Sequence, residues 1–184
     1  MPLSTTETPA MSKPLFAAVV IAMAAISFDR AFSHDPVDEA HAPLPGMSEA
    51  AARQQAAVLH KTMHSTLRVT HDRYYVEDEG LPIPAAVLKE VFADIKDTQN
   101  ITLRWLAVEG QAMNTDHKAK DAFEKDAVKA LKSGKKVFEQ TQDGVYRRAG
   151  AITLENHCLK CHVPDRRSTR DRTAGLLIAI PIER

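Results

Sequence analysis

Cysteine, net charge and long apolar runs are all scarce in this chain of 184 residues. Two cysteines are too few for a disulfide framework. The 24 basic and 24 acidic residues cancel, so nothing favours nucleic acid or an anionic membrane as a partner. No phosphate-binding glycine loop, Ser-His-Asp order or paired-carboxylate site can be picked out of the sequence. We therefore expect a binding or electron-transfer protein rather than an enzyme.

The longest apolar run, residues 15–28, is also short, because a transmembrane helix needs about 20 such residues. It follows Lys13 and has the length of the hydrophobic region of a secretory signal peptide. Ala31 and Ser33 are small residues at the positions that a signal peptidase reads, which predicts cleavage after Ser33. The alternative is an uncleaved membrane anchor. Either interpretation exports the rest of the chain, so we expect a periplasmic or otherwise exported protein.

The expected organisation is a signal peptide or anchor over 1–33, an extended leader over 34–47 and one domain over 48–184. The leader has three prolines and no apolar periodicity. Removal of 33 residues from 184 leaves 151, which is enough to bury a real core.

Both cysteines lie in the stretch ENHCLKCHVP, residues 155–164. In an exported protein, Cys-x-x-Cys-His is the attachment sequence for c-type haem. Residues three apart on a helical turn point the same way, so Cys158 and Cys161 can both form thioethers to one porphyrin. His162 then lies under the macrocycle as the proximal iron ligand. We expect one covalently attached haem c.

Three other kinds of site use similar residues. A structural zinc site needs four ligands, but His157, Cys158, Cys161 and His162 are too close in sequence to converge readily on one metal. A thioredoxin-like dithiol stands just after an early strand, whereas these cysteines come late in the chain. A disulfide across three residues leaves His162 unexplained. The motif and the export signal agree on haem.

Proline, glycine and apolar periodicity divide the domain into helices and strands. Ser48 is the expected N-cap of a long helix from Glu49 to about Tyr74. Further helices are expected over 85–97 and 118–134, the second of them closed by Gly134. Strands are expected over 100–110, over 135–140 and 144–154 joined by a hairpin at TQDG, and over 174–183.

The order of these elements is helix, helix, strand, helix, strand, strand, motif and strand. It predicts an α+β domain with an antiparallel sheet. The last strand is continuously apolar, so we expect it to be central. In the strand over 100–110, Ile101, Leu103, Trp105 and Ala107 alternate with positions expected to be polar or solvated.

The chain resembles the exported single-haem c-type domains with a PAS-like fold, found alone or as sensor regions of bacterial signalling proteins. The likeness rests on DGVYRRAGAITLENHCLKCHVP, MNTDHKAKDAFEKDAV and AGLLIAIPIE, and covers about residues 50–183. It implies a PAS-like antiparallel sheet, a long N-terminal helix and a haem-attachment turn near the C-terminus. Thr115 and His117 depart from the family's Asn-Pro-x-Asn pattern, which leaves that turn without its usual residues.

The resemblance also implies a sixth iron ligand from the long N-terminal helix, about a hundred residues before the motif. A relative uses cysteine there, but this chain has no spare cysteine. At about 100° per residue, His60, His64 and His71 lie within about 40° of one another on one face of the helix. His64 is the distal candidate because its distance from the motif fits best, and the alternatives are His60, His71 and Met63.

Four arginines follow the motif, namely Arg166, Arg167, Arg170 and Arg172. Guanidinium groups are suited to haem propionates, so these residues are candidate propionate partners. The alternative, equally weighted, is a solvated loop partly neutralised by Asp165 and Asp171. We expect His157 to be exposed and His117 to be a turn or cap residue.

These features predict a periplasmic monohaem cytochrome acting in electron transfer or redox sensing, with two axial ligands that close the iron to substrates. The alternative is a haem with an open or labile sixth site, as in a sensor of nitric oxide or carbon monoxide or a weak peroxidase. The chain carries no transmitter domain, so a sensor would act through a separate redox or membrane signalling partner. We expect membrane contact only if the N-terminal segment stays uncleaved.

Overall fold

The computed structural model describes residues 47–76, 79–110, 112, 114–156, 158–159 and 167–183. All of them belong to the second of the two compact units into which the chain divides, Glu39–Arg184. The expected signal peptide over 1–33 and the leader up to residue 46 lie outside the described residues, as do His157, Cys161, His162 and Arg166. None of the helices described is long and apolar enough to cross a membrane.

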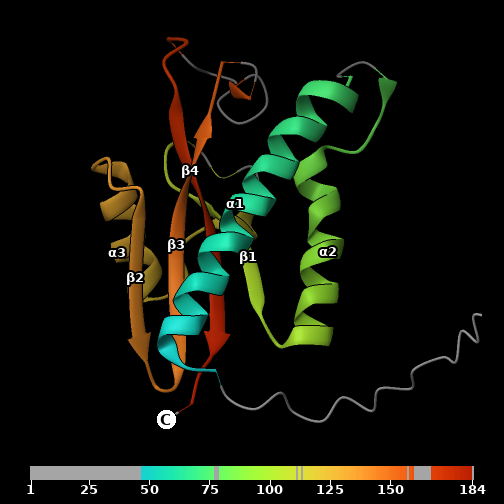
Figure 1. Ribbon diagram of the computed structural model, residues 1–184. Coiled ribbons are helices and arrows are strands. Elements are labelled where there is room, and N and C mark those ends of the chain that lie inside the picture. Colours follow the sequence, from blue (N-terminus) through green and yellow to red (C-terminus); the bar gives the residue numbers. More distant parts are fainter. Residues whose placement is uncertain are drawn as a thin grey trace, which may run out of the picture. The chain divides into compact units, whose positions relative to one another are not determined.

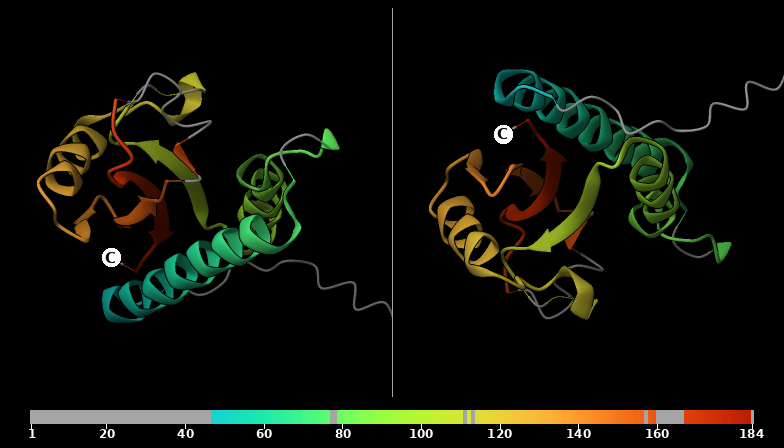
Figure 2. Two further views of the ribbon diagram at one scale, coloured as in Figure 1. Left: turned by 90° about the horizontal axis from the view of Figure 1, so that it is seen from above. Right: turned by 90° about the horizontal axis from the view of Figure 1, so that it is seen from below.

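A four-stranded antiparallel sheet forms the centre of this unit, with strand order β1-β4-β3-β2. The strands are β1 (Thr102–Ala107), β2 (Val137–Gln142), β3 (Val145–Leu154) and β4 (Arg172–Pro181). Helices α1 (Glu49–Tyr74) and α2 (Pro84–Gln99) lie against one face, and α3 (Ala122–Lys132) lies against the other (Figures 1 and 2). The predicted α+β class with an antiparallel sheet is confirmed, and so is the central position of the last strand.

Local sequence signals set the ends of several elements. The Ser48 side chain accepts a hydrogen bond from the Ala51 amide at 3.3 Å and so caps the start of α1. Gly134 follows the C-cap of α3 with φ +95° and donates its amide to the Leu131 carbonyl. Both of these predictions are confirmed.

The predicted hairpin is present, with a tighter turn than the four residues TQDG suggested. Thr141 and Gln142 still belong to β2, where they pair with Tyr146 and Val145. The turn itself has only Asp143 and Gly144, both with positive φ, as a two-residue hairpin of this kind requires.

The expected apolar face of the second helix is only partly covered. Helix α2 begins at Pro84, one residue earlier than expected, because proline fits the first helical position. Phe92 is buried, and Leu88 and Ile95 pack against the core. Val87 and Val91 are 44% and 39% exposed, so they lie beyond the surface that α1 and β1 cover.

Each face of the sheet carries its own core. One core joins α1 and α2 to the sheet through residues such as Ala56, Met63, Phe92, Trp105 and Ile178. The other joins α3 to the sheet through Leu106, Phe123, Ala127, Leu131 and Leu177. Coverage of both faces explains why β4 is continuously apolar. It also corrects the expectation for the strand over 100–110, whose alternate side, with Leu106 and Val108, is buried rather than solvated.

The turn before α3 forms without the proline that is usual in the resembled family. The short helix η2 (Thr115–His117) follows Asn114, whose side chain accepts a hydrogen bond from the Asp116 amide at 2.9 Å. Arg104 of β1 then donates to the main-chain carbonyls of Asp116 and Lys118. Local capping and one arginine therefore define this turn, and His117 is a turn residue as expected.

Candidate haem-binding site

Three histidines line one side of the C-terminal half of α1. His60 and His64 are one turn apart, with ring centroids 5.9 Å apart in an edge-to-face arrangement. The ring of His71 lies 5.0 Å from that of Tyr75, the residue that ends the helix. All three histidines are partly buried, so the structure keeps these imidazoles at the edge of the core rather than in solvent.

His60 lies directly on the backbone of β3. A Cβ atom built on Gly150 would overlap the Cδ2 and Nε2 atoms of His60, so the imidazole occupies the space that a side chain would need. The Nε2 atom is buried and has no hydrogen-bond partner among the described residues. Burial lowers the pKa of His60, and His64 and Arg148 lower it further, against a smaller opposite effect of the Gly150 and Ala151 backbone.

His64 faces the segment that leads into the cysteine motif. Burial lowers the pKa of His64, and Lys61 and Arg68 lower it further, while the Glu155 carboxylate partly offsets them. Glu155 is the first residue after β3 and comes three residues before Cys158. Glu155, just before the motif, therefore lies within electrostatic range of His64.

Cys158 lies in a helical turn that begins at Glu155, directly after β3. Its amide donates to the Glu155 carbonyl at 2.9 Å, and the next amide, that of Leu159, donates to the carbonyls of Glu155 and Asn156. Leu159 is fully buried and fixes this turn to the core. Cys158 is a free thiol, and burial raises its pKa, with Glu155 and Asp72 adding to the rise. Asp72 belongs to the last turns of α1, so that end of the helix is within electrostatic range of Cys158.

The remaining predicted site residues divide into three groups. Cys161, His162 and Arg166 lie outside the described residues. Met63 is 8% exposed and packs within the core of the α1/α2 face. Arg167 and Arg170 are exposed, whereas Arg172 donates to the Arg170 carbonyl at 2.8 Å and to Ser168 at 3.2 Å, so it fastens its own loop.

The predictions from sequence missed two residues next to the histidines. Gly150 had a readable signal, because a glycine inside a strand often marks the close approach of another group. Arg148, two positions earlier on β3, had no such signal. Its Nη1 atom donates to Glu139 at 3.1 Å, while its Nε atom is buried and lacks a partner in the described parts of the chain.

The histidines of α1 fit a haem group by the chemistry of their donor atoms. Neutral imidazole nitrogen is a common axial ligand of haem iron, and the lowered pKa values keep His60 and His64 neutral at pH 7. The unpartnered Nε2 atom of His60 shows that the described residues alone do not satisfy this side of α1. In those same residues, no group of three or more His, Cys, Asp or Glu side chains could hold a bare metal ion. The imidazole donors of α1 therefore suit an axial position on haem iron.

Comparison with known proteins places these features in a family. The chain is similar to the crystal structure of the cyanobacterial heme-protein Tll0287, with 18% identity and a TM-score of 0.51. The match covers 72% of this chain and 94% of that chain. No curated protein sequence matches. A model described as Tll0287-like matches residues 46–175, which is more than half of the sequence, and the chain therefore belongs to the Tll0287-like family.

Proposed function

We propose that this protein carries one covalently attached haem c and acts in one-electron transfer or redox sensing. Cys158 and Cys161 would form the two thioethers, and His162 would bind the iron on the proximal side. Membership of the Tll0287-like family and the similarity to a cyanobacterial heme-protein support the cofactor. The helical turn over residues 155–159, which contains Cys158, is compatible with this attachment.

The observation that carries the proposal is the position of the histidine side of α1. Glu155, just before the Cys-x-x-Cys-His motif, lies within electrostatic range of His64, and Asp72, near the end of α1, lies within electrostatic range of Cys158. A group held between the motif and this side of the helix would meet imidazoles from α1. When bound, haem supplies an iron that alternates between the ferrous and ferric states.

His64 remains our candidate for the second axial ligand. His60 rests on Gly150, His71 contacts Tyr75, and Met63 packs in the core. Among the described residues, the His64 ring meets the edge of the His60 ring, and Glu155 acts on His64 electrostatically. Its burial also limits access of water to the imidazole. Met63 and His71 are thus used in packing, whereas His60 rests on β3 with an Nε2 atom that lacks a partner among the described residues; we assign the axial bond to His64 and keep His60 as an alternative.

Two imidazole ligands suit a protein that exchanges electrons. They close both axial positions, so no vacancy is left for a gas or a peroxide. Export, by cleavage after Ser33 or by an anchor over 15–28, would place the protein in the periplasm, where a separate redox or signalling partner would receive the electron or the signal. A high-spin iron would instead make the protein a sensor of nitric oxide or carbon monoxide, or a weak peroxidase.

The absorption spectrum of the reduced protein, with and without carbon monoxide, tests this function. We expect a low-spin spectrum that carbon monoxide does not change. The substitution His64→Ala should open the site, turn the ferric form high-spin, allow carbon monoxide to bind and raise the reduction potential. His60→Ala and His71→Ala are matched controls on the same side of α1 and should alter the spectrum less.

Two results would change the proposal in different ways. If wild type binds carbon monoxide at once, the protein is a gas-binding one. If His64→Ala stays low-spin while His60→Ala, His71→Ala or Met63→Ala does not, the axial ligand is the residue whose loss opens the iron.

A further inference from the structure

Exposed apolar side chains concentrate where α1 ends and α2 begins. Among the described residues, eight large hydrophobic side chains are exposed, and seven of them fall between residues 69 and 91: Val69, Tyr74, Val76, Leu81, Ile83, Val87 and Val91. Tyr74 is 73% exposed although its ring is large. An apolar surface of this kind on a soluble domain often marks a binding site.

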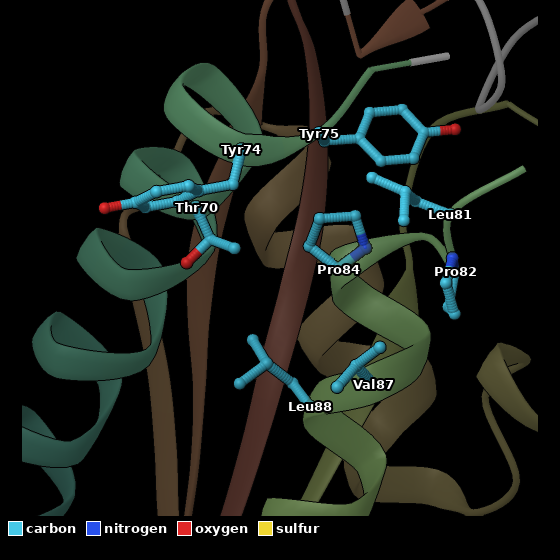
Figure 3. A pocket seen from close by; sticks show the side chains of 8 residues that line it. All are labelled: Thr70, Tyr74, Tyr75, Leu81, Pro82, Pro84, Val87 and Leu88. Atoms are coloured by element: carbon cyan, nitrogen blue, oxygen red, sulfur yellow. The ribbon is translucent and has the colours of Figure 1, made fainter. Parts of the chain in front are cut away.

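A cavity of about 370 Å³ lies within this region. Its walls come from Thr70 and Tyr74 near the end of α1, Tyr75, Leu81 and Pro82 in the connecting segment, and Pro84, Val87 and Leu88 of α2. Figure 3 shows Pro84 and Leu88 between the two helices, with Tyr74 and Thr70 on the α1 side. The volume is within the range of about 300–1,000 Å³ that is typical of small-molecule pockets.

The walls of this cavity select for a neutral, apolar ligand. None of the eight lining residues carries a charge. The hydroxyl groups of Tyr74 and Tyr75 point away from Pro84 at the middle of the cavity, so mainly carbon atoms face a ligand (Figure 3). Aromatic rings and proline rings pack well against a planar ring system. A dry apolar cavity of about 150 Å³ can bind benzene, so this larger cavity has room for two fused rings.

The cavity is separate from the histidine side of α1. At about 100° per residue, Thr70 points about 100° away from His71, toward α2 rather than toward β3. Tyr75 is the one lining residue that approaches the histidines, because its ring lies 5.0 Å from that of His71. A ligand in the cavity would therefore not compete for an axial position on the iron.

The sequence of the connecting segment disfavours an anionic membrane as the partner of this surface. In the sequence of this segment, Val76 is followed by Glu, Asp and Glu at positions 77–79. Anionic lipids attract basic clusters and are repelled by acidic ones. The surface is therefore better suited to an uncharged small molecule than to a lipid headgroup.

We propose that this cavity is a binding site for a small neutral molecule with a planar apolar ring system of about two fused rings. The ring would lie against Pro84, Leu88 and the face of Tyr74, with any polar substituent at the opening. The proposal is independent of the haem and of the axial ligands.

Calorimetric titration of the purified, haem-loaded protein with 2-naphthol tests the site. We expect one molecule to bind per chain. Val87→Asp places a charge in the wall of the cavity and should weaken binding at least about tenfold, because the ligand cannot pair with that charge. Val91→Asp is the matched control, since Val91 is similarly exposed one turn later on α2 but does not line the cavity. It should bind as wild type does.

Three results would overturn the proposal. The first is absence of 2-naphthol binding to the wild-type protein. The second is equal loss of binding in Val87→Asp and Val91→Asp. The third is a wild-type dimer that Val87→Asp converts to a monomer, measured by light scattering, because the surface would then be an interface between two copies. The haem absorption spectrum of both variants checks that each is folded.

Discussion

The two faces of the sheet differ in what lies beside their buried polar groups. On the α3 face, Glu124 is 5% exposed and lies 2.5 Å from Arg104 and 3.5 Å from Arg147. It also accepts a hydrogen bond from the Lys120 amide at the start of α3. On the α1 face, the Nε2 atom of His60 and the Nε atom of Arg148 are buried without partners in the described residues.

This difference separates a structural face from one that is open to ligands. Buried polar groups in folded proteins are nearly always paired, so those left unpaired indicate where a missing group or water belongs. On the α3 face the Nη2 atom of Arg104 also lacks a hydrogen-bond partner among the described residues, but the Glu124 carboxylate lies 2.5 Å away and neutralises the charge, and Arg104 holds the turn before the helix. The α1 face holds the histidines, the start of the motif and the apolar cavity, and it is there that we place both the cofactor and the proposed ligand.

The largest expected effect on stability is on the α3 face of the sheet. Glu124→Ala removes the carboxylate that neutralises Arg104, whose side chain is only 20% exposed, and should lower the free energy of unfolding by about 3–5 kcal/mol. Asp126→Ala is the control on the same helix, because Asp126 pairs with Lys129 in solvent, and it should cost less than about 1 kcal/mol. Urea unfolding measures both. If Glu124→Ala and Asp126→Ala lowered the free energy of unfolding by similar amounts, the ion pairs of Glu124 would not be a main source of stability.

The next effect compares one glycine on each face. Gly150→Ala forces the His60 ring away from β3 and should destabilise the protein by about 1–3 kcal/mol. Gly175→Ala, whose Cβ would lie 3.2 Å from Leu131, requires a smaller adjustment and should cost less. The cost of Gly150→Ala should largely disappear in the background of His60→Gly, which removes the ring. Thermal unfolding of wild type and of these four variants measures the costs. Equal destabilisation by Gly150→Ala and Gly175→Ala would contradict this account.

The smallest expected effect concerns how the stabilisation by Glu139 changes with pH. Burial alone would raise the pKa of Glu139, but the Tyr146 hydroxyl, Arg53 and Arg148 outweigh it and hold the pKa below its usual value. Because the folded-state pKa is the lower one, the stabilisation is present above the unfolded pKa and is lost as the pH falls through the folded value. Glu139→Gln should cost about 1 kcal/mol at pH 7 and less near pH 3.

The difference between wild type and Glu139→Gln, measured by urea unfolding at both pH values, checks the sign of this dependence. If the difference in unfolding free energy between wild type and Glu139→Gln were larger near pH 3 than at pH 7, the predicted direction would be wrong. Asp143→Asn in the exposed hairpin turn is a control that should show little change at either pH.

Features set by neighbouring residues were predictable from the sequence. Ser48, Gly134 and the Asp143-Gly144 turn act through the backbone within a few positions, so their signals are local. The order of elements and the central last strand followed from the same kind of signal. The Cys-x-x-Cys-His motif is local too, and for that reason the sequence alone was enough to predict haem.

Features set by contacts between distant elements were not predictable. Periodicity indicated an apolar face on α2 but could not show that Val87 and Val91 lie beyond the surface that its neighbours cover. Nor could it show that α3 buries Leu106 on the second face of the sheet. The contact of His60 with Gly150 joins residues 90 positions apart, and only the fold brings them together.

The covalent attachment of haem is the central claim, and acid-acetone extraction tests it most directly. The protein should be produced in an exporting host that has haem-maturation machinery. Wild type should keep its haem through the extraction, and the double substitution Cys158→Ala with Cys161→Ala should release it. A colourless wild-type protein that carries zinc, or a haem that acid-acetone removes from wild type, would contradict the account.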